Sequence, residues 1–231
     1  MDQLRQKYTN WLINQNLNYA LKFNGINQYA SLGTMGNFGS NLGNGFYNSF
    51  QIQTTNTTLG EFGQYNGANS VMIGLNAIGF ESLGAGHLAF FLNDSANNNA
   101  LIGYTTNNTN FNDGNKHIIV ITANPATNII TISVDSAPQA ITYIAQQTPS
   151  SFGNFGKNFC LGGRQTYTGA YDEFFACTID NFQIGTSSSV LYGNYKMDEG
   201  SGTTIADSSG NGNTGTLVND TSPSTMWVPG L

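Results

Sequence analysis

The sequence predicts an all-β fold, an antiparallel β-sandwich preceded by a short N-terminal α-helix. Short runs of β-branched and aromatic residues alternate with polar residues, as half-buried strands require. Turns rich in Gly and Asn separate these runs about every ten residues, a spacing typical of sandwiches and jelly rolls. Helical periodicity is confined to the N-terminus, and 231 residues suit one large all-β domain of the jelly-roll type.

Residues 1–20 are predicted to form the helix, as a possible docking element ahead of the jelly-roll domain at 21–231. The apolar residues of this segment fall on one helical face: Leu4, Tyr8, Trp11 and Leu12. A lone amphipathic helix this short is marginal in water, so something must bury its apolar face. Two interpretations stay open, a helix packed on the sandwich and a helix that attaches to another protein.

The strand pattern begins at Leu21. Residues 21–32 are predicted as one strand kinked at Asn24-Gly25, followed by an uncharged Gly-rich loop with buried Phe or Leu anchors. The polar residues 57–70 are predicted as a loop. The clearest hairpin joins residues 117–123 and 128–135. Further strands are predicted at 50–55, 71–75, 87–92, 101–105, 141–144, 159–161 and 178–184.

Residues 195–230 carry the most specific signal in the chain. Glycines interleaved with Asp, Ser and Asn demand turns with positive φ, so neither a helix nor a long strand fits. Short apolar pieces at 195–197, 203–206 and 216–218 are predicted as two or three short strands, and the segment ends near Trp227.

Four segments together carry a family resemblance. They are DEGSGTT with DSSGNGN and a later Trp in the tail, LKFNGINQYASL at 21–32, the DGNKH turn with its following strands at 113–135, and LGG with TIDNFQIG at 161–184. These segments resemble the laminin-G-like jelly-roll domains of the concanavalin A-like lectin/glucanase superfamily. The resemblance implies a concanavalin A-like jelly roll, a fold that hosts lectins, adhesion modules, spacers and enzymes.

The order of these segments departs from the family's usual one, because the DEGSGTT segment follows the FNG strand instead of preceding it. Three explanations stay open: a circular permutation in which the tail completes the same sandwich, a truncated second repeat, and a strand donated to a neighbouring subunit. We favour permutation. The late position of the segment also resembles that in some phage structural proteins.

Composition excludes some functions. Charged residues make up 9% of the chain and the net charge is -6, so nucleic-acid binding through Lys and Arg is not expected. No apolar run approaches the length of a membrane span, and the N-terminus lacks a signal-peptide pattern, so no membrane span is expected. The uncharged Asn-rich surface suits virion or extracellular proteins. Cys160 and Cys177 are expected to be buried thiols, with one disulfide as the alternative.

Catalytic patterns are weak. Hydrolases of the resembling family cluster carboxylates as E-x-D-x-x-E, which is absent here. Asp172-Glu173 and Asp198-Glu199 are adjacent pairs, whose side chains point to opposite faces of a strand. His87 and His117 lie in separate strands without a zinc or triad pattern, and His117 is expected to be a packing residue. We expect no enzymatic activity.

Calcium is the one cofactor that the sequence suggests, in a structural role. The resemblance implies a site made by Asn24, the carbonyl of Gly25 and Asp180, although Asn replaces the family's usual Asp and removes one negative charge. A second possible set is Asp207, Asn211 and Asn213, which serves equally as turn chemistry.

Sugar binding requires an aromatic face together with amides and carboxylates. Predicted loops supply these groups: Tyr65, Asn66, Tyr167, Tyr171, Asp172 and Glu173. We therefore expect a non-catalytic binding or structural module.

The expected setting is a virion surface, with the module as a capsid-decorating, spike or fibre protein that recognises host-cell glycans. Residues 1–20 would then dock on capsid or tail proteins. The alternative is a secreted or cell-surface bacterial carbohydrate-binding or adhesion module. A glycoside hydrolase or lyase is the third hypothesis.

Overall fold

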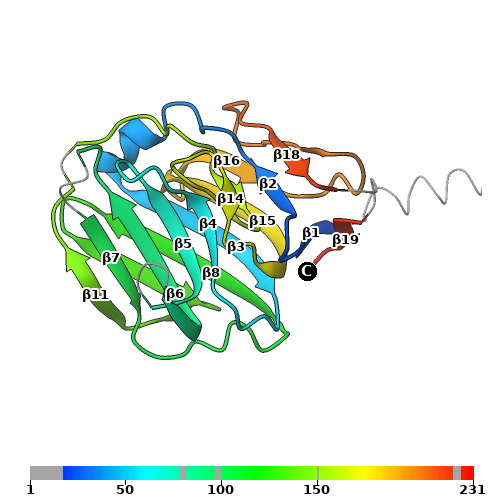
Figure 1. Cartoon of the computed structure of the whole chain (residues 1–231), viewed down its shortest axis with the longest axis horizontal. Coiled ribbons are helices and arrows are strands. Elements are labelled where there is room, and N and C mark those ends of the chain that lie inside the picture. Colours follow the sequence, from blue (N-terminus) through cyan, green and yellow to red (C-terminus); the bar gives the residue numbers. More distant parts are fainter. Residues whose placement is uncertain (1–17, 79–81, 97–99, 150, 221–224) are drawn as a thin grey trace, which may run out of the picture.

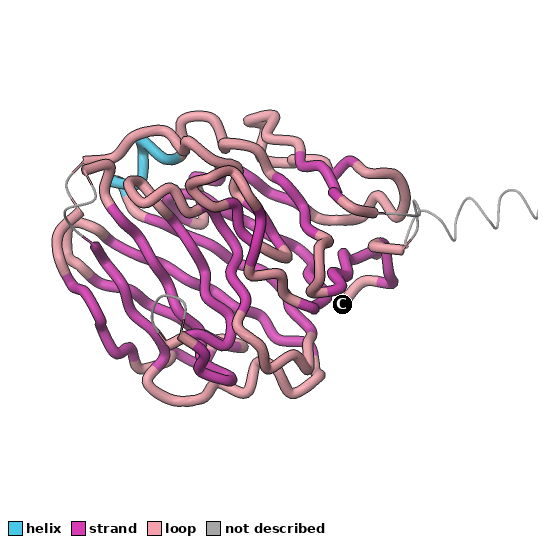
Figure 2. Tube along the Cα trace, viewed as in Figure 1, coloured by secondary structure: helices cyan, strands magenta, loops and turns pink. Residues whose placement is uncertain are grey.

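A computed structural model describes residues 18–78, 82–96, 100–149, 151–220 and 225–231. The predicted fold class is confirmed, because the chain forms two sheets that pack face to face as a sandwich (Figure 1). Strands and loops make up almost all of the described residues, and their one helical element is the 3₁₀ turn η1 (Gly39–Asn44) (Figure 2). Residues 1–17 of the helix predicted at 1–20 lie outside the described residues, whereas Asn18 lies in a loop and Tyr19 and Ala20 belong to a strand.

Sheet A has eight strands. Its order is β10 (Ala137–Pro138), β9 (Ile129–Val134), β8 (Lys116–Asn124), β3 (Phe46–Gln53), β15 (Ala176–Ser187), β1 (Tyr19–Asn24) and β19 (Trp227–Pro229), with β16 (Val190–Tyr195) on the second half of β15. The hairpin predicted at 117–135 is confirmed as β8 and β9. Alternate residues of β3 are buried, as period-two patterning requires.

Sheet B has eleven strands. Its order is β11 (Ile141–Gln146), β7 (Ala100–Thr105), β6 (Leu83–Asn93), β5 (Val71–Ala77), β4 (Gly60–Gln64), β12 (Cys160–Leu161), β2 (Tyr29–Ser31), β18 (Gly215–Val218) and β17 (Thr204–Ile205). At the side of β4, β13 (Arg164–Gln165) pairs in parallel, and β14 (Tyr171–Asp172) pairs with β13. The prediction of a loop at 57–70 was wrong where β4 lies, since all five residues of this strand are buried and show no alternation.

The core between the sheets is rich in phenylalanine. Phe46 of sheet A and Phe90 of sheet B meet with ring centroids 4.6 Å apart. Phe38 and Leu42, from the Gly-rich loop around η1, are fully buried in the same core, as predicted. Truncating such a side chain typically lowers the free energy of unfolding by about 3–5 kcal/mol, so these rings contribute much of the stability that holds the two sheets together.

Residues 21–32 form two strands rather than the predicted single kinked one. β1 belongs to sheet A and β2 to sheet B, so the chain crosses between the sheets at Asn24-Gly25. Gly25 has φ +69°, and a Cβ there would lie 2.7 Å from the nitrogen of Ala176, so the corner requires glycine. Ile26, at the corner, is 74% exposed instead of contributing to the core.

The C-terminal segment completes the sandwich within the same chain. Its strands join both sheets, because β18 pairs with β2 and β19 pairs with β1 (Figure 1). The hydroxyl of Tyr195 donates to the carbonyl of Asn213 at 2.6 Å, and the nitrogen of Gly230 donates to the carbonyl of Asn18 at 2.8 Å. Both ends of the described chain therefore use one apolar interior. Permutation relative to the resembling family stays a prediction.

The two cysteines are buried and unpaired, as predicted. Cys160 lies in sheet B and Cys177 in sheet A, and burial raises the pKa of both thiols. Within the described ranges, no helix has the length and apolar character needed to cross a membrane.

Candidate functional site

Three of the residues predicted for sugar binding gather around Arg164, a residue that was not predicted from the sequence. We call Glu61, Tyr65, Arg164, Tyr167 and Asp172 the Arg164 cluster. Strand pairing assembles it: β13 lies beside β4, and Arg164 is the register partner of Asp172 on β14. The nitrogen of Tyr65 donates to the carbonyl of Gln165 at 2.9 Å, so the residue after β4 is held beside β13.

Arg164 holds both carboxylates of the cluster. Its Nη1 donates to Oε2 of Glu61 at 2.5 Å, and its Nε donates to Oδ1 of Asp172 at 2.8 Å. Arg164 is 3% exposed and Glu61 0%, whereas the side chain of Asp172 is 45% exposed. The buried charge of Glu61 is thus compensated, and Asp172 is fixed at the surface.

Two tyrosines flank this ion pair. The ring of Tyr65 lies 5.4 Å from the guanidinium carbon of Arg164, a cation–π distance. Tyr167 meets Tyr65 edge to face with centroids 6.2 Å apart, and Tyr167 is itself 64% exposed. Tyr65 therefore supports Tyr167, which presents an aromatic surface to solvent.

Tyr171 packs against other residues of the protein, which leaves it less available as a stacking surface for a ligand. It stacks on Tyr29 with centroids 4.2 Å apart, and its hydroxyl accepts from Nε2 of Gln165 at 2.9 Å. Burial, and then the hydrogen bond with Tyr171, raise the pKa of Tyr29. We therefore assign Tyr171 a supporting position behind the cluster.

Asn66 and Glu173 border the cluster through their main chains. The nitrogen of Asn66 donates to Oγ of Ser70 at 3.0 Å. The carbonyl of Glu173 accepts from the nitrogen of Glu61 at 3.2 Å, and Glu173 has φ +49°. These contacts position the neighbouring strand ends.

Glu61 and Asp172 do not form the arrangement of a hydrolytic pair. In glycoside hydrolases the scissile bond lies between the two carboxyl groups. Here the guanidinium of Arg164 lies between them and binds both, and Glu61 is fully buried. The geometry fixes two charges and leaves no space for a sugar between the carboxylates.

The structure does not bring together Asn24 and Asp180, the residues implied for calcium with Gly25. The Oδ1 of Asn24 accepts from the nitrogens of Ile26 and Asn27, as a turn cap. Asn24 is the partner of Ala176 in register, and Asp180 lies four positions along β15, about 13 Å away. No group of three His, Cys, Asp or Glu side chains suited to a metal ion occurs in the described part of the chain. Calcium binding stays a prediction, which a chelator-dependent shift of Tm would test.

Asp207 serves the turn chemistry that was the alternative to a calcium site. Its two oxygens accept from the nitrogens of Asn194, Ser209 and Asn213 at 2.8–3.0 Å, and from Oγ of Ser209 at 2.8 Å. Burial works to raise the pKa of Asp207, but these hydrogen bonds outweigh it and lower the pKa. Asn211 donates to the carbonyl of Leu191. The Asp-Ser-Ser-Gly-Asn-Gly-Asn segment thereby ties the tail to β16.

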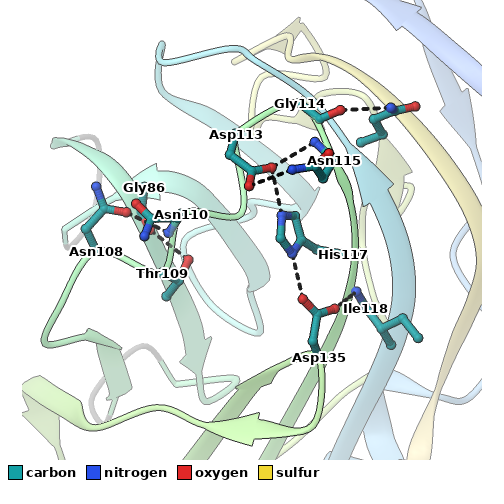
Figure 3. Close-up of polar contacts among 11 residues, drawn as sticks. Gly86, Asn108, Thr109, Asn110, Asp113, Gly114, Asn115, His117, Ile118 and Asp135 are labelled. Carbon is teal, nitrogen blue, oxygen red and sulfur yellow. Dashed lines mark hydrogen bonds and ion pairs between the residues drawn. The ribbon is translucent and has the colours of Figure 1, made fainter.

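His117 bridges two carboxylates, which differs from the prediction that it is a packing residue (Figure 3). Its Nδ1 lies 2.7 Å from Oδ2 of Asp135 and its Nε2 lies 3.0 Å from Oδ1 of Asp113. Partial burial works to lower the pKa of His117, but the two carboxylates outweigh it and raise the pKa. The hydrogen bonds from His117 and Asn115 lower the pKa of Asp113 to about 2.

A separate groove of about 510 Å³ lies where β1, β15 and the loop after β3 meet. Lys22, Asn24, Thr54 and Thr178 contribute to its lining, and its one aromatic lining residue, Phe23, is 1% exposed. The groove lacks the exposed ring that sugar stacking requires, so we place the candidate site at the Arg164 cluster.

Comparison with solved structures gives a relationship of fold. A candidate carbohydrate-binding protein from Bacteroides ovatus superposes with a TM-score of 0.63 and 14% identity, covering 93% of this chain and 62% of that one. Domains LG4-5 of the mouse laminin α1 chain give a TM-score of 0.51 and 13% identity, covering 75% and 42%. This chain thus spans less than two thirds of either protein.

No family model and no curated protein matches the sequence. At these identities the likeness to solved structures shows the fold alone, which is the concanavalin A-like jelly roll.

Proposed function

We propose that this chain is a non-catalytic glycan-binding module whose sugar site is the Arg164 cluster. One observation carries the proposal: the exposed ring of Tyr167 packs against Tyr65, Tyr65 lies over Arg164, and the buried Arg164 holds the half-exposed carboxylate of Asp172. The apolar face of a pyranose stacks on the ring, and its hydroxyls donate to the carboxylate. Because both groups are already ordered, binding costs less side-chain entropy.

The similarity of fold supports this proposal without establishing it. The Bacteroides ovatus protein that shares the fold is described as a candidate carbohydrate-binding protein. A fold by itself hosts many functions, so the site carries the argument.

The setting that we propose is a virion surface, where the module would act as a capsid-decorating, spike or fibre protein. The low share of charged residues, 9%, supports a particle-borne surface, and residues 1–20 would dock on capsid or tail proteins. Mass spectrometry of purified virions tests this proposal. If the proposal is correct, the chain is detected in them.

The similarity to a Bacteroides ovatus protein favours the alternative, a secreted or cell-surface bacterial module. Its detection in the secreted or surface fraction of bacterial cells, and its absence from particles, would replace the virion proposal.

The binding proposal is tested by Tyr167→Ala on a glycan array, followed by titration calorimetry with a retained glycan. Loss of the stacking ring should weaken binding about tenfold or more. The matched control is Ile144→Ala, which removes a side chain of similar exposure, 55% against 64%, from the far edge strand β11. Wild-type affinity in Tyr167→Ala would overturn the assignment of the site.

Catalysis is tested on the same glycans. Incubation with the protein should release no reducing ends. Release that disappears in Asp172→Asn, with the variant still folded by circular dichroism, would instead establish a hydrolase.

A further inference from the structure

The charges of the Arg164 cluster do not cancel. The cluster contains two carboxylates and one guanidinium, so one negative charge is in excess. Glu61 is 0% exposed and Arg164 3%, whereas the side chain of Asp172 is 45% exposed. The excess charge therefore lies on the one member of the ion-pair network that faces solvent.

Arg164 is not positioned to receive an anionic ligand. Its Nη1 is bonded to Glu61, its Nε to Oδ1 of Asp172, and its Nη2 lies 3.5 Å from Oδ2 of Asp172. The side chain also lies over β5, with Nη1 3.9 Å from Sδ of Met72. A carboxylate or sulfate would have to displace Asp172 and enter a site beside the buried Glu61, at a cost in both hydrogen bonds and repulsion.

Lys157 is the cation next to the turn that carries Tyr167. Its Nζ lies 3.8 Å from the position of a Cβ built on Gly169. A lysine ammonium is strongly hydrated and sits on a flexible stem, whereas Asp172 is held by Arg164. The ordered charge that faces solvent at the site is thus the negative one of Asp172.

Building on the proposed function, we infer that the Arg164 cluster selects uncharged glycans with free hydroxyls and disfavours glycans that carry carboxylate or sulfate groups. The Asp172 carboxylate has only acceptor oxygens, so it pairs with sugar hydroxyls and repels anionic groups. Selectivity of this kind arises from the unfavourable contact as much as from the favourable one.

Homogalacturonan provides a probe in which charge is the principal variable. The protein would be titrated onto surfaces coated with polygalacturonate and with its fully methyl-esterified form, and onto dextran and dextran sulfate. A glycan array with sialylated and desialylated pairs extends the comparison. We expect retention on the neutral member of a pair to exceed that on the charged member by about tenfold at low salt, and the difference to shrink as salt screens the repulsion.

Two variants identify the residue responsible. Asp172→Asn removes the excess negative charge, so the ratio between neutral and charged retention should fall even if affinity for both declines. Lys157→Gln should leave the preference for the neutral member in place. A site that instead uses Lys157 to bind anions would lose its charged ligands in this variant.

The outcomes separate this inference from the proposed function. Equal or stronger retention of the charged members overturns the charge selectivity and leaves glycan binding intact. Retention of none of the arrayed glycans overturns both. Preference for neutral members with an unchanged ratio in Asp172→Asn also overturns the inference, because the preference would then come from another part of the surface.

Discussion

Asp180 is a buried carboxylate with an incompletely compensated charge. It is 0% exposed, and its Oδ2 accepts from the nitrogen of Leu231 at 3.2 Å, while its Oδ1 has no hydrogen-bond partner. Gln51 lies opposite on β3, and its Oε1 also lacks a partner. Burial is the main cause that raises the pKa of Asp180. A proton on Asp180 would remove this buried charge and would turn one of its acceptor oxygens into a hydrogen-bond donor.

We expect Asp180→Asn to stabilise the protein by about 1 kcal/mol at neutral pH, because an amide supplies that donor without a charge. The raised folded-state pKa means that protonated Asp180 stabilises the fold below the unfolded pKa of about 3.9, and that this contribution is lost as pH rises through the folded pKa. Urea unfolding at several pH values measures the difference, which should vanish in acid. Asp198→Asn removes a neighbouring charge that also raises the pKa of Asp180, and it should keep a pH dependence of the same sign because Asp180 still titrates. A variant less stable than wild type at pH 7 would contradict the protonation argument.

Arg164→Met should destabilise the fold by about 3–5 kcal/mol, since it leaves Glu61 buried without its cation. The double variant Glu61→Leu with Arg164→Met should recover most of this loss, because no charge then remains buried. Denaturant titration of the three proteins gives the values. Equal losses in the single and double variants would show that packing, rather than uncompensated charge, determines the cost.

At the scale of single elements, strands with regular alternation or a continuous apolar run could be predicted, as β8 and β5 show, whereas β4 could not. The hairpin β8–β9 follows its predicted bounds closely because one face of each strand is buried and the other is solvated. β4 was missed because its buried residues include two glycines, Glu61 and Gln64, so they do not form an apolar run in the sequence. The crossing from β1 to β2 was predicted as a kink within one strand. The sequence pattern indicates a bend at this point, but it does not indicate that the residues after the bend join the other sheet.

The candidate site was predicted only in part, because the sequence shows local residue types but not contacts between distant residues. Tyr65, Tyr167 and Asp172 were chosen as loop aromatics and acids, and strand pairing brings them together. Arg164 and Glu61 were missed because a buried ion pair between residues 103 positions apart leaves no local pattern. The one available signal was an arginine shortly after the predicted strand at 159–161, in a chain with only seven Lys and Arg residues.

His117 joins the start of β8 to the turn after β9, so its protonation should affect the stability of this hairpin. Because its folded-state pKa is raised, its contribution is complete below the unfolded pKa of about 6.5 and is lost as pH rises through the folded pKa. We expect Tm to fall by a few degrees on going from mildly acidic to alkaline pH. His117→Gln should remove this dependence, whereas His87→Gln should keep it. A persistent slope in His117→Gln would assign the effect to other groups.

At the scale of the whole molecule, the two ends of the described chain meet. Asn18 and Leu231 both bind the carboxylate of Asp180, and Gly230 bonds to Asn18. β1 and β19, next to these ends, are neighbours in sheet A (Figure 1). A short link between these ends would therefore leave the pairing of the strands in place, and we expect the order of the strands in space not to depend on where the chain is cut.

A circular permutant tests this independence. It would join Leu231 to Asn18 by a short Gly-Ser linker and open the exposed β15–β16 turn between Ser188 and Ser189. We expect the same far-UV circular dichroism and cooperative unfolding as in the unpermuted chain. A permutant opened between Phe50 and Gln51, inside central strand β3, should not fold. Failure of both permutants would show that the tail must follow the body of the sandwich.

The alkylation rates of the two buried thiols can report how fast each sheet of the sandwich opens. Cys160 lies in one sheet and Cys177 in the other, and raised thiol pKa values make both slow to react while the core is closed. If the two sheets open only in one cooperative step, an alkylating reagent should modify both thiols at the same rate. That rate should equal the rate expected from global unfolding. Faster alkylation of either thiol would identify the layer that frays first, without any added label.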